Sequence, residues 1–273
     1  MPFALRLTNQ ENWGIPRRDF ERILHLSPRG CFLACYGSTK LGIATTISYG
    51  KKLGWIGNVV VDRRYRERNI GRSLVQQATR YLDSSGVDHI GLYCFKENVK
   101  FYEKLGFVGD AEFLRLLRRN ESTPRLVNPF DPDRPTSLGN VLYADKKALG
   151  ADRSKLIRLL LAQKAAWYLG RSRTKTSTSY LMVKEYADMR EIGPWVCINP
   201  HKGDPEEMLL KALTMTSDKP IEISCLRNNR RAVDVLKSHG FRTIREGFRM
   251  YFHDRARIGN DQHNFAIGFL DKG

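Results

Sequence analysis

Arginines gather on one short segment of the N-terminal half, between an apolar run and an amphipathic stretch. Residues 55–61 are mostly apolar, and from residue 70 an apolar residue recurs at every fourth position. The segment around this junction contains Arg63, Arg64, Arg66, Arg68 and Arg72. A helix N-terminus already presents unpaired N–H groups and partial positive charge, so arginines placed there destabilise one another unless an anion binds among them. The pattern therefore predicts a binding site for an anionic ligand.

A second group of residues that could take part in catalysis or binding follows a strand predicted over 88–94. From residue 98 to residue 107 the sequence is Asn-Val-Lys-Phe-Tyr-Glu-Lys-Leu-Gly-Phe. The spacing predicts a short helix that contains Tyr102 and ends near Gly106, where glycine permits the turn into the next strand. The phenol of Tyr102 can donate a hydrogen bond or a proton.

Together these two motifs resemble the GNAT superfamily of N-acetyltransferases. The family's pyrophosphate loop follows a central strand and has the pattern Arg/Gln-x-x-Gly-x-Gly/Ala, which residues 66–71 fill as Arg-Glu-Arg-Asn-Ile-Gly. Asn69 stands where the family has its first glycine, and asparagine tolerates a left-handed backbone better than most residues. The family signature Asn-x-x-Phe-Tyr-x-x-Leu-Gly-Phe is filled by residues 98–107.

The resemblance implies acetyl-CoA as cosubstrate and a primary amine that attacks the thioester directly, without an acyl-enzyme. It implies that a backbone N–H of the central strand polarises the thioester carbonyl. Tyr102, the implied catalytic residue, would hydrogen-bond or protonate the departing thiolate as general acid. The implied cofactor-binding residues are Val59, Val60, Val61, Arg66, Glu67, Arg68, Asn69, Ile70, Gly71, Arg72, Ser73, Asn98 and Tyr102.

No general base for the amine is assigned from the sequence. His89, Glu97, Asp62 and Glu103 all lie near the motifs, yet helix and strand surfaces commonly contain such residues. Cys94 is predicted to be a packing residue, because no histidine and acidic partner stand at a spacing that would activate its thiol. The histidines do not cluster with the cysteines at metal-ligand spacing, so no metal is expected.

The elements that position these residues alternate between short strands and helices. Strands are predicted at 3–7, 31–36, 42–49 and 54–61, and helices at 17–26 and from residue 70 to near Gly86. This alternation favours an α/β or α+β architecture. With the family resemblance, the predicted fold class is α+β (an α/β sandwich) with two tandem GNAT-like domains. Each domain is expected to be a mixed, mostly antiparallel sheet flanked by helices.

The composition changes after residue 119 to a stretch rich in Pro, Asn and Asp, which is typical of a linker. We assign residues 1–125 to a catalytic acetyl-CoA-binding domain, 126–140 to a linker and 141–273 to a second GNAT-like domain. Within the second domain, a helix is predicted over 144–164, strands between 167 and 198, and a last strand over 264–270.

The second half repeats both motifs in altered form. Residues 221–241 match the arrangement of the tyrosine motif, but Leu236 stands where the tyrosine would be. The loop over 201–207, His-Lys-Gly-Asp-Pro-Glu-Glu, contains acidic residues in place of the arginines. We expect this domain to be degenerate, to bind no CoA, and to form part of the acceptor site, with one active site per chain.

The charge of the chain predicts an anionic partner. Lys and Arg number 46 against 29 Asp and Glu, a net charge of +17. A polyphosphate cofactor, an acidic acceptor or nucleic acid would each meet this expectation. A non-catalytic CoA-binding or nucleic-acid-binding module is therefore the alternative function. Arg171, Arg173 and Lys175 adjoin a Ser/Thr run, but no aromatic-interleaved recognition motif accompanies them.

The remaining features favour a cytoplasmic enzyme, and the family resemblance implies that its acceptor is a small-molecule amine or a protein amine. No run approaches about 18 apolar residues, so no membrane span is expected. The first residues show no secretory or transit signal. The five cysteines include no CxxC pair, which is typical of reduced thiols.

Overall fold

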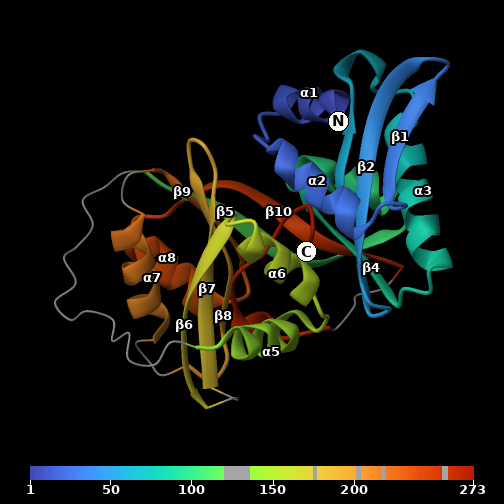
Figure 1. Cartoon of the computed structure of the whole chain (residues 1–273). Helices are drawn as coiled ribbons and strands as arrows, with labels where there is room; N and C mark the ends of the chain where they lie inside the picture. The colour runs from blue at the N-terminus through green and yellow to red at the C-terminus, as the bar shows by residue number, and fades with distance from the viewer. Residues whose placement is uncertain (120–135, 175–176, 201–203, 217–218, 254–257) are drawn as a thin grey trace. The chain divides into compact units, whose positions relative to one another are not determined.

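The computed structural model describes residues 1–119, 136–174, 177–200, 204–216, 219–253 and 258–273. They form two compact units (Figure 1). The first comprises Met1–Asp110, Arg249–Ala256 and Leu270–Gly273, and the second comprises Ala111–Phe248 and Arg257–Phe269. The first unit thus takes residues from both ends of the chain. Of the predicted linker over 126–140, residues 126–135 lie outside the described ranges, and residues 138–140 begin a helix.

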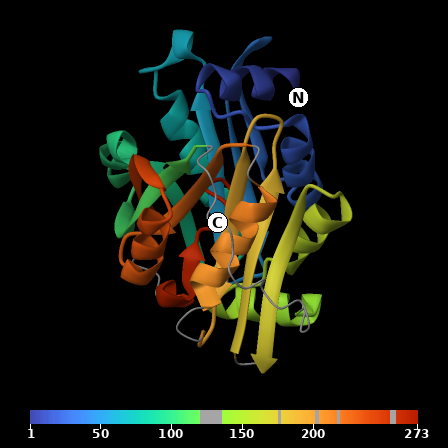
Figure 2. The same cartoon turned by 90° about the vertical axis from the view of Figure 1, so that its left-hand side faces the viewer.

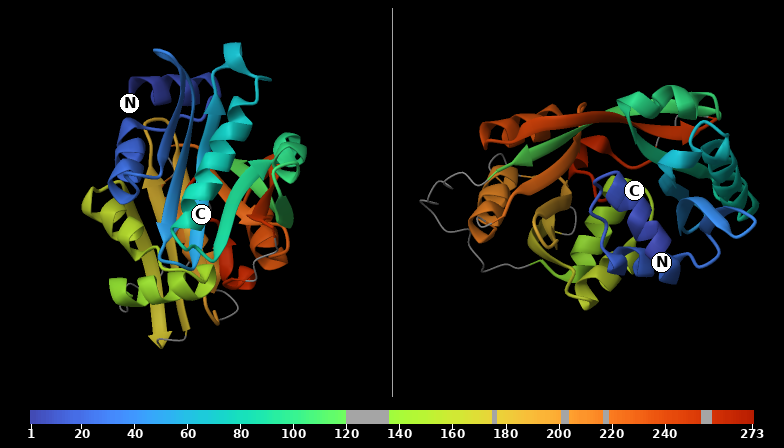
Figure 3. Two further views of the ribbon diagram at one scale, coloured as in Figure 1. Left: turned by 90° about the vertical axis from the view of Figure 1, so that its right-hand side faces the viewer. Right: turned by 90° about the horizontal axis from the view of Figure 1, so that it is seen from above.

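The first unit is a sheet with helices on both faces (Figures 1 and 3). Strands β1 (Cys31–Tyr36), β2 (Thr39–Tyr49) and β3 (Leu53–Val61) are antiparallel, and β3 is parallel to β4 (His89–Phe95). Helices α1 (Pro2–Gln10) and α2 (Arg17–Leu26) cover one face, and α3 (Ile70–Ser84) covers the other. Two short turns of 3-10 helix, η1 (Arg63–Tyr65) and η2 (Lys96–Asn98), precede α3 and α4 (Val99–Glu103). Strand β5 (Phe107–Arg118) follows α4.

The strand predicted at residues 3–7 is wrong, because this segment is part of helix α1. Leu7 is fully buried, and Phe3 and Ala4 pack against the same core cluster, which is the spacing of one helix face. Pro2 fits the first helical turn, where its missing N–H is not needed. A short apolar run fits a strand or a helix equally well, so periodicity alone did not separate them. The helix at 17–26 and the three antiparallel strands are confirmed.

The second unit has the same plan (Figure 2). Strands β6 (Ala166–Thr174), β7 (Ser177–Glu185) and β8 (Arg190–Cys197) are antiparallel, and β8 is parallel to β9 (Ile221–Leu226). Helices α5 (Leu138–Leu149) and α6 (Ser154–Ala162) lie on one face, and α7 (Asp204–Met215) and α8 (Arg230–Ser238) lie on the other. The single helix predicted over 144–164 is wrong: α5 ends at Gly150, whose φ of +80° is left-handed, and α6 begins four residues later.

The two halves of the chain share one element order: two helices, three antiparallel strands, then helix, strand, helix and strand. The last strand of each repeat lies beside strands of the other repeat. Strand β10 (Arg242–Phe252), which closes the second repeat, lies beside β4, whereas β5, which closes the first repeat, pairs with β9. The predicted fold class, two tandem α+β domains with mostly antiparallel sheets, is confirmed.

The parallel strand pair at the centre of each unit is joined only at its beginning. The register of β3 and β4 runs from Leu53↔His89 to Trp55↔Gly91, although β3 continues to Val61 and β4 to Phe95. In the second unit, β8 and β9 pair over three residues in the same way. There β11 (Asn264–Ala266) pairs with the later part of β8, and the Ile267 N–H donates to the Ser224 carbonyl of β9 at 2.7 Å. The space between β8 and β9 is therefore filled by the chain itself.

Candidate functional site

The arginine-rich segment forms a tight loop at the start of α3. Glu67 and Asn69 have φ values of +65° and +59°, so both are left-handed, and Asn69 is the residue before the first helical residue. The backbone conformation expected for Asn69 is therefore found. The first helical bond runs from the Ser73 N–H to the Asn69 carbonyl at 3.0 Å. Ordinary helix geometry leaves the amides of Ile70, Gly71 and Arg72 without an acceptor inside the helix.

Glu11, the residue that follows helix α1, contacts the arginines of this loop. The Glu11 carboxylate accepts from Arg66 Nη2 at 2.6 Å and from Arg63 Nε at 3.1 Å. Burial raises the pKa of Glu11, but the hydrogen bonds and charges of these arginines outweigh it and hold the pKa below its usual value. Arg66 also donates to the Val61 carbonyl at 3.3 Å, which fixes its guanidinium at the end of β3.

The other predicted loop residues lie along the same surface. The Arg68 guanidinium lies over the Tyr65 ring, 5.8 Å from its centre. Arg68, Arg72 and Ser73 are exposed, and Ile70 and Gly71 are half-buried. A Cβ added at Gly71 would lie 3.4 Å from Phe101 and 3.7 Å from Val61, which is ordinary contact distance. The helix start therefore lies against β3 and α4.

Strand β3 leads into this loop with alternating side chains. Val60 is buried in the cluster formed with Leu7, Phe20 and Ile43, while Val59 and Val61 are half-buried on the opposite face. The half-buried face is the one that continues toward Gly71. The structure thus brings Val59 to Val61, Arg66 and the first turn of α3 into one continuous stretch.

Tyr102 is buried on α4, and its ring makes edge contacts with Phe101 and Phe107. Burial, together with Cys94 nearby, raises the pKa of Tyr102 well above its usual value of about 10. Within the described residues no group hydrogen-bonds to its hydroxyl. Asn98, at the start of α4, is exposed and its side chain makes no capping bond. Cys94 is buried, with its Sγ 3.4 Å from Met250 Sδ.

The side chains considered as a general base, Asp62, Glu97, Glu103 and His89, lie in different surroundings. Asp62 is 1% exposed and is held by Arg6 and Arg64, both at 2.9 Å. Hydrogen bonds from Arg64 and then Arg6 outweigh the effect of burial and hold the pKa of Asp62 far below its usual range, so this carboxylate is a poor base. Glu97 and Glu103 are exposed, and His89 is half-buried.

Two contacts near these motifs, made by Glu11 and by Asn58, were not predicted from the sequence. Glu11 lies far from the loop along the chain, and no local pattern links it to Arg66. Asn58 lies inside the apolar strand β3, and a single amide among buried apolar residues was a signal that could have been followed. Asp271, which accepts from Asn58, lies near the other end of the chain, so no sequence pattern connects the two.

A phosphate-bearing ligand fits the loop on three observations. The helix start presents unpaired amides, the left-handed residues turn the backbone around this point, and Arg66, Arg68 and Arg72 are exposed beside it.

The corresponding position in the second unit differs. Helix α7 begins with Asp204, Glu206 and Glu207, and Arg171 is ion-paired to Asp204 at 2.9 Å. Leu236 is fully buried where the first unit has Tyr102.

No helix among the described residues is both long and apolar enough to cross a membrane. Nor do they contain a group of three or more His, Cys, Asp or Glu side chains that could hold a metal ion.

Comparisons with known proteins identify acetyltransferase sequences in both halves of the chain. A model described as the acetyltransferase (GNAT) family matches residues 4–107, and a model described as an acetyltransferase (GNAT) domain matches residues 141–266. The chain is 25% identical to the uncharacterized N-acetyltransferase YitH of Bacillus subtilis (strain 168), over 96% of this chain and 92% of that protein.

Two further similarities cover different lengths. A crystal structure of a proposed acetyltransferase from Pyrococcus horikoshii superposes with a TM-score of 0.78 at 23% identity, over 96% of this chain and 88% of that one. Human N-alpha-acetyltransferase 30 is 33% identical over 103 residues, which are 35% of this chain and 28% of that protein.

Proposed function

Because this chain belongs to the GNAT acetyltransferase family, we propose that it is an N-acetyltransferase that moves an acetyl group from acetyl-CoA to a primary amine. The observation that supports this most is the loop before α3. It combines left-handed Asn69, unpaired helix amides and exposed arginines, which together suit the pyrophosphate of CoA. The residues that would hold the cofactor are Val59 to Val61, the loop from Arg66 to Ser73, Asn98 and Tyr102.

In the proposed reaction a neutral amine forms a bond to the acetyl carbon, and the bond from that carbon to sulfur breaks. The amine loses one proton to solvent, and the departing sulfur gains one. Tyr102 is the proposed donor to sulfur, and it regains its proton from solvent. Its raised pKa keeps the phenol protonated near neutral pH, so it can supply a hydrogen bond in a buried setting. Direct attack needs no covalent enzyme intermediate, which fits a buried Cys94 packed against methionine.

We propose one acetyl-CoA site per chain, in the first unit. Strand β11 fills the space between β8 and β9, and acidic residues begin α7. Both features oppose binding of a polyphosphate there. Leu236 offers no hydroxyl in place of Tyr102.

The test is thiol release from acetyl-CoA with a panel of amines, with products identified by mass spectrometry. Peptides with a free amino terminus belong in the panel, because the name of human N-alpha-acetyltransferase 30 points to that class. Small primary amines complete it. We expect acetylated product from at least one class, and none from a Tyr102→Phe and Arg66→Ala double variant.

The alternative is a binding module without turnover. The net charge of +17 is the observation that favours it. Arg171, one of the basic residues considered for nucleic acid, is instead ion-paired to Asp204 and Glu207. Binding of CoA without turnover of any amine, together with salt-sensitive binding to RNA or DNA, would replace the proposed enzyme by this module.

A further inference from the structure

A buried amide lies at an irregular point in the middle of strand β3. The register of β2 and β3 shifts between Ile43↔Val60 and Thr45↔Gly57, so β3 has one extra residue there. Asn58 lies in this bulge with φ of +50° and is 5% exposed. It directly precedes Val59 to Val61, the stretch along which the cofactor is proposed to lie. It also follows Trp55, the last residue of β3 that pairs with β4.

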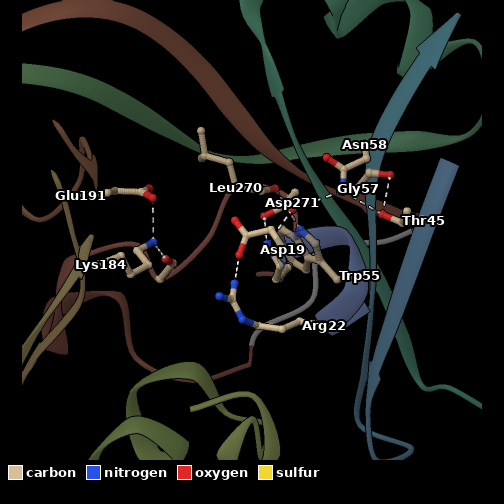
Figure 4. Close-up of polar contacts among 12 residues, drawn as sticks. Asp19, Arg22, Thr45, Trp55, Gly57, Asn58, Lys184, Glu191, Leu270 and Asp271 are labelled. Carbon is tan, nitrogen blue, oxygen red and sulfur yellow. Dashed lines mark hydrogen bonds and ion pairs between the residues drawn. The ribbon is translucent and has the colours of Figure 1, made fainter. Parts of the chain in front are cut away.

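The C-terminal segment of the chain lies against this bulge (Figure 4). Trp55 Nε1 donates to the Leu270 carbonyl at 3.3 Å, and the Tyr49 hydroxyl donates to the Lys272 carbonyl. A Cβ at Gly57 would lie 2.1 Å from the Asp271 carbonyl oxygen, so only glycine allows this close approach. The segment 270–273 is thus held to β2 through Tyr49 and to β3 through Trp55 and Gly57.

The hydrogen bonds around Asn58 fix the orientation of its amide. Nδ2 lies 3.1 Å from Thr45 Oγ1 and 3.2 Å from Asp271 Oδ2. The Asp271 carboxylate can only accept hydrogen bonds, and Lys272 Nζ contacts both of its oxygens, at 2.9 and 2.7 Å. The single Thr45 hydroxyl hydrogen goes to the Gly57 carbonyl at 3.1 Å. Both neighbours therefore need the amide hydrogens of Asn58, and a flipped amide would lose both bonds.

This orientation leaves the side-chain oxygen of Asn58 as a buried acceptor. Among the described residues it has no hydrogen-bond partner. An unsatisfied buried acceptor costs free energy, and nearly all such groups in folded proteins have a donor. A donor to this oxygen would be an N–H or O–H from outside the described residues, on a ligand or a water.

We propose that Asn58 Oδ1 accepts an N–H of the acceptor amine, and that Asp271 and Thr45 are positioning residues that hold the Asn58 amide in this orientation. The inference rests on the proposed function and assigns its acceptor side. An amine with one N–H bonded to Asn58 has its lone pair directed elsewhere, as attack on the acetyl carbon requires. The C-terminal segment thereby becomes part of the active site of the first unit.

The kinetic test uses Asn58→Gly, which keeps the left-handed backbone and removes the amide. The matched control is Asn12→Gly, the same change at an exposed asparagine with φ of +55°. With the best amine of the panel, Asn58→Gly should raise KM for the amine about tenfold, the effect of one lost hydrogen bond, while the Kd for acetyl-CoA stays unchanged. Asp271→Asn can donate to Asn58 and so permits the flipped amide, and it should raise the same KM by less. Equal kinetics for Asn58→Gly and Asn12→Gly would overturn the inference and leave the proposed function standing.

A second test needs no turnover. The side-chain amide signals of Asn58 are followed by nitrogen-15 NMR while ethylammonium chloride or tetramethylammonium chloride is added to the protein. Only the first cation has N–H donors, so only it should shift these signals. Signals that respond to neither salt, or equally to both, would show that water or the solvent ions satisfy Oδ1 and would overturn the inference. If ethylammonium alone shifts the signals but no amine is acetylated, the amine site at Asn58 stands and the proposed acetyltransferase reaction is wrong.

Discussion

Arg66 Nη2 lies 2.6 Å from Glu11 Oε1, an ion pair between residues 55 positions apart. The arginine is the first residue of the loop proposed to hold the CoA pyrophosphate. The carboxylate also contacts Arg63. Glu11 therefore places a negative charge beside this group of arginines.

Removal of the Glu11 charge should strengthen cofactor binding. Glu11→Gln takes away a carboxylate that competes with phosphate for Arg66, and half-exposed ion pairs of this kind contribute up to about 1 kcal/mol. We expect the Kd for CoA to fall by up to about fivefold, measured by calorimetry at low salt. The gain should shrink as salt is added, because screening weakens both charges. Glu21→Gln, which breaks an exposed ion pair to Arg17 on α2, is the control and should leave the Kd unchanged. A weaker affinity in Glu11→Gln would mean that Glu11 orients Arg66.

The left-handed backbone at Asn69 leads to a second prediction. Glycine adopts φ of +59° without strain, whereas a β-branched residue does not. Asn69→Gly should retain the Kd for CoA within about twofold, and Asn69→Val should weaken it by about tenfold or more, a cost of 1–2 kcal/mol in backbone strain. Calorimetric titration with CoA measures both. Equal affinities for the two variants would mean that the left-handed turn does not position the ligand.

Local patterns along the chain predicted most of the first unit. The three antiparallel strands, helix α2 and the left-handed turn at Asn69 each depend on neighbours a few residues away, and such signals are visible in a sequence. The internal repeat was visible for the same reason, since each copy retains the order of its elements. The prediction for residues 3–7 was wrong because a short segment with four apolar residues fits either a strand or a helix.

Contacts between distant residues were not predictable in this way. Exchange of β5 and β10 changes which strands pair without changing where the strands occur along the chain. The bond from Asn58 to Asp271 joins residues 213 positions apart, and Glu11, which follows helix α1, contacts Arg66 from 55 positions away. Each depends on tertiary packing. As a result, the cofactor side of the candidate site was predicted from sequence, whereas its proposed acceptor side required the structure.

Loss of the Tyr102 hydroxyl should affect turnover and not cofactor affinity. Tyr102→Phe keeps the edge contacts with Phe101 and Phe107, so the fold should be unchanged. We expect kcat to fall by about 100-fold, the lower end of the usual contribution of a general acid, with the Kd for acetyl-CoA unchanged. Since the pKa of Tyr102 is raised, kcat in the wild-type protein should show no decline from this group up to about pH 10. Tyr65→Phe, outside the buried helix, is the control. Unchanged kcat in Tyr102→Phe would remove the acid role.

The buried Asp62 carboxylate should stabilise the fold in a pH-dependent way. Its pKa is lowered in the folded protein by Arg64 and Arg6, so its contribution is complete above the unfolded value near pH 4 and is lost as pH falls toward the folded value. Asp62→Asn should lower the free energy of unfolding by about 1–2 kcal/mol at pH 7, a modest amount because both arginines are exposed and solvated. Urea denaturation of both proteins from pH 7 to pH 3 measures the difference. It should be constant down to about pH 5 and shrink below pH 4. Asp83→Asn, at an exposed position on α3, should show no difference at any pH. A difference for Asp62→Asn that stays constant down to pH 3 would mean that the loss comes from packing and not from the ion pairs.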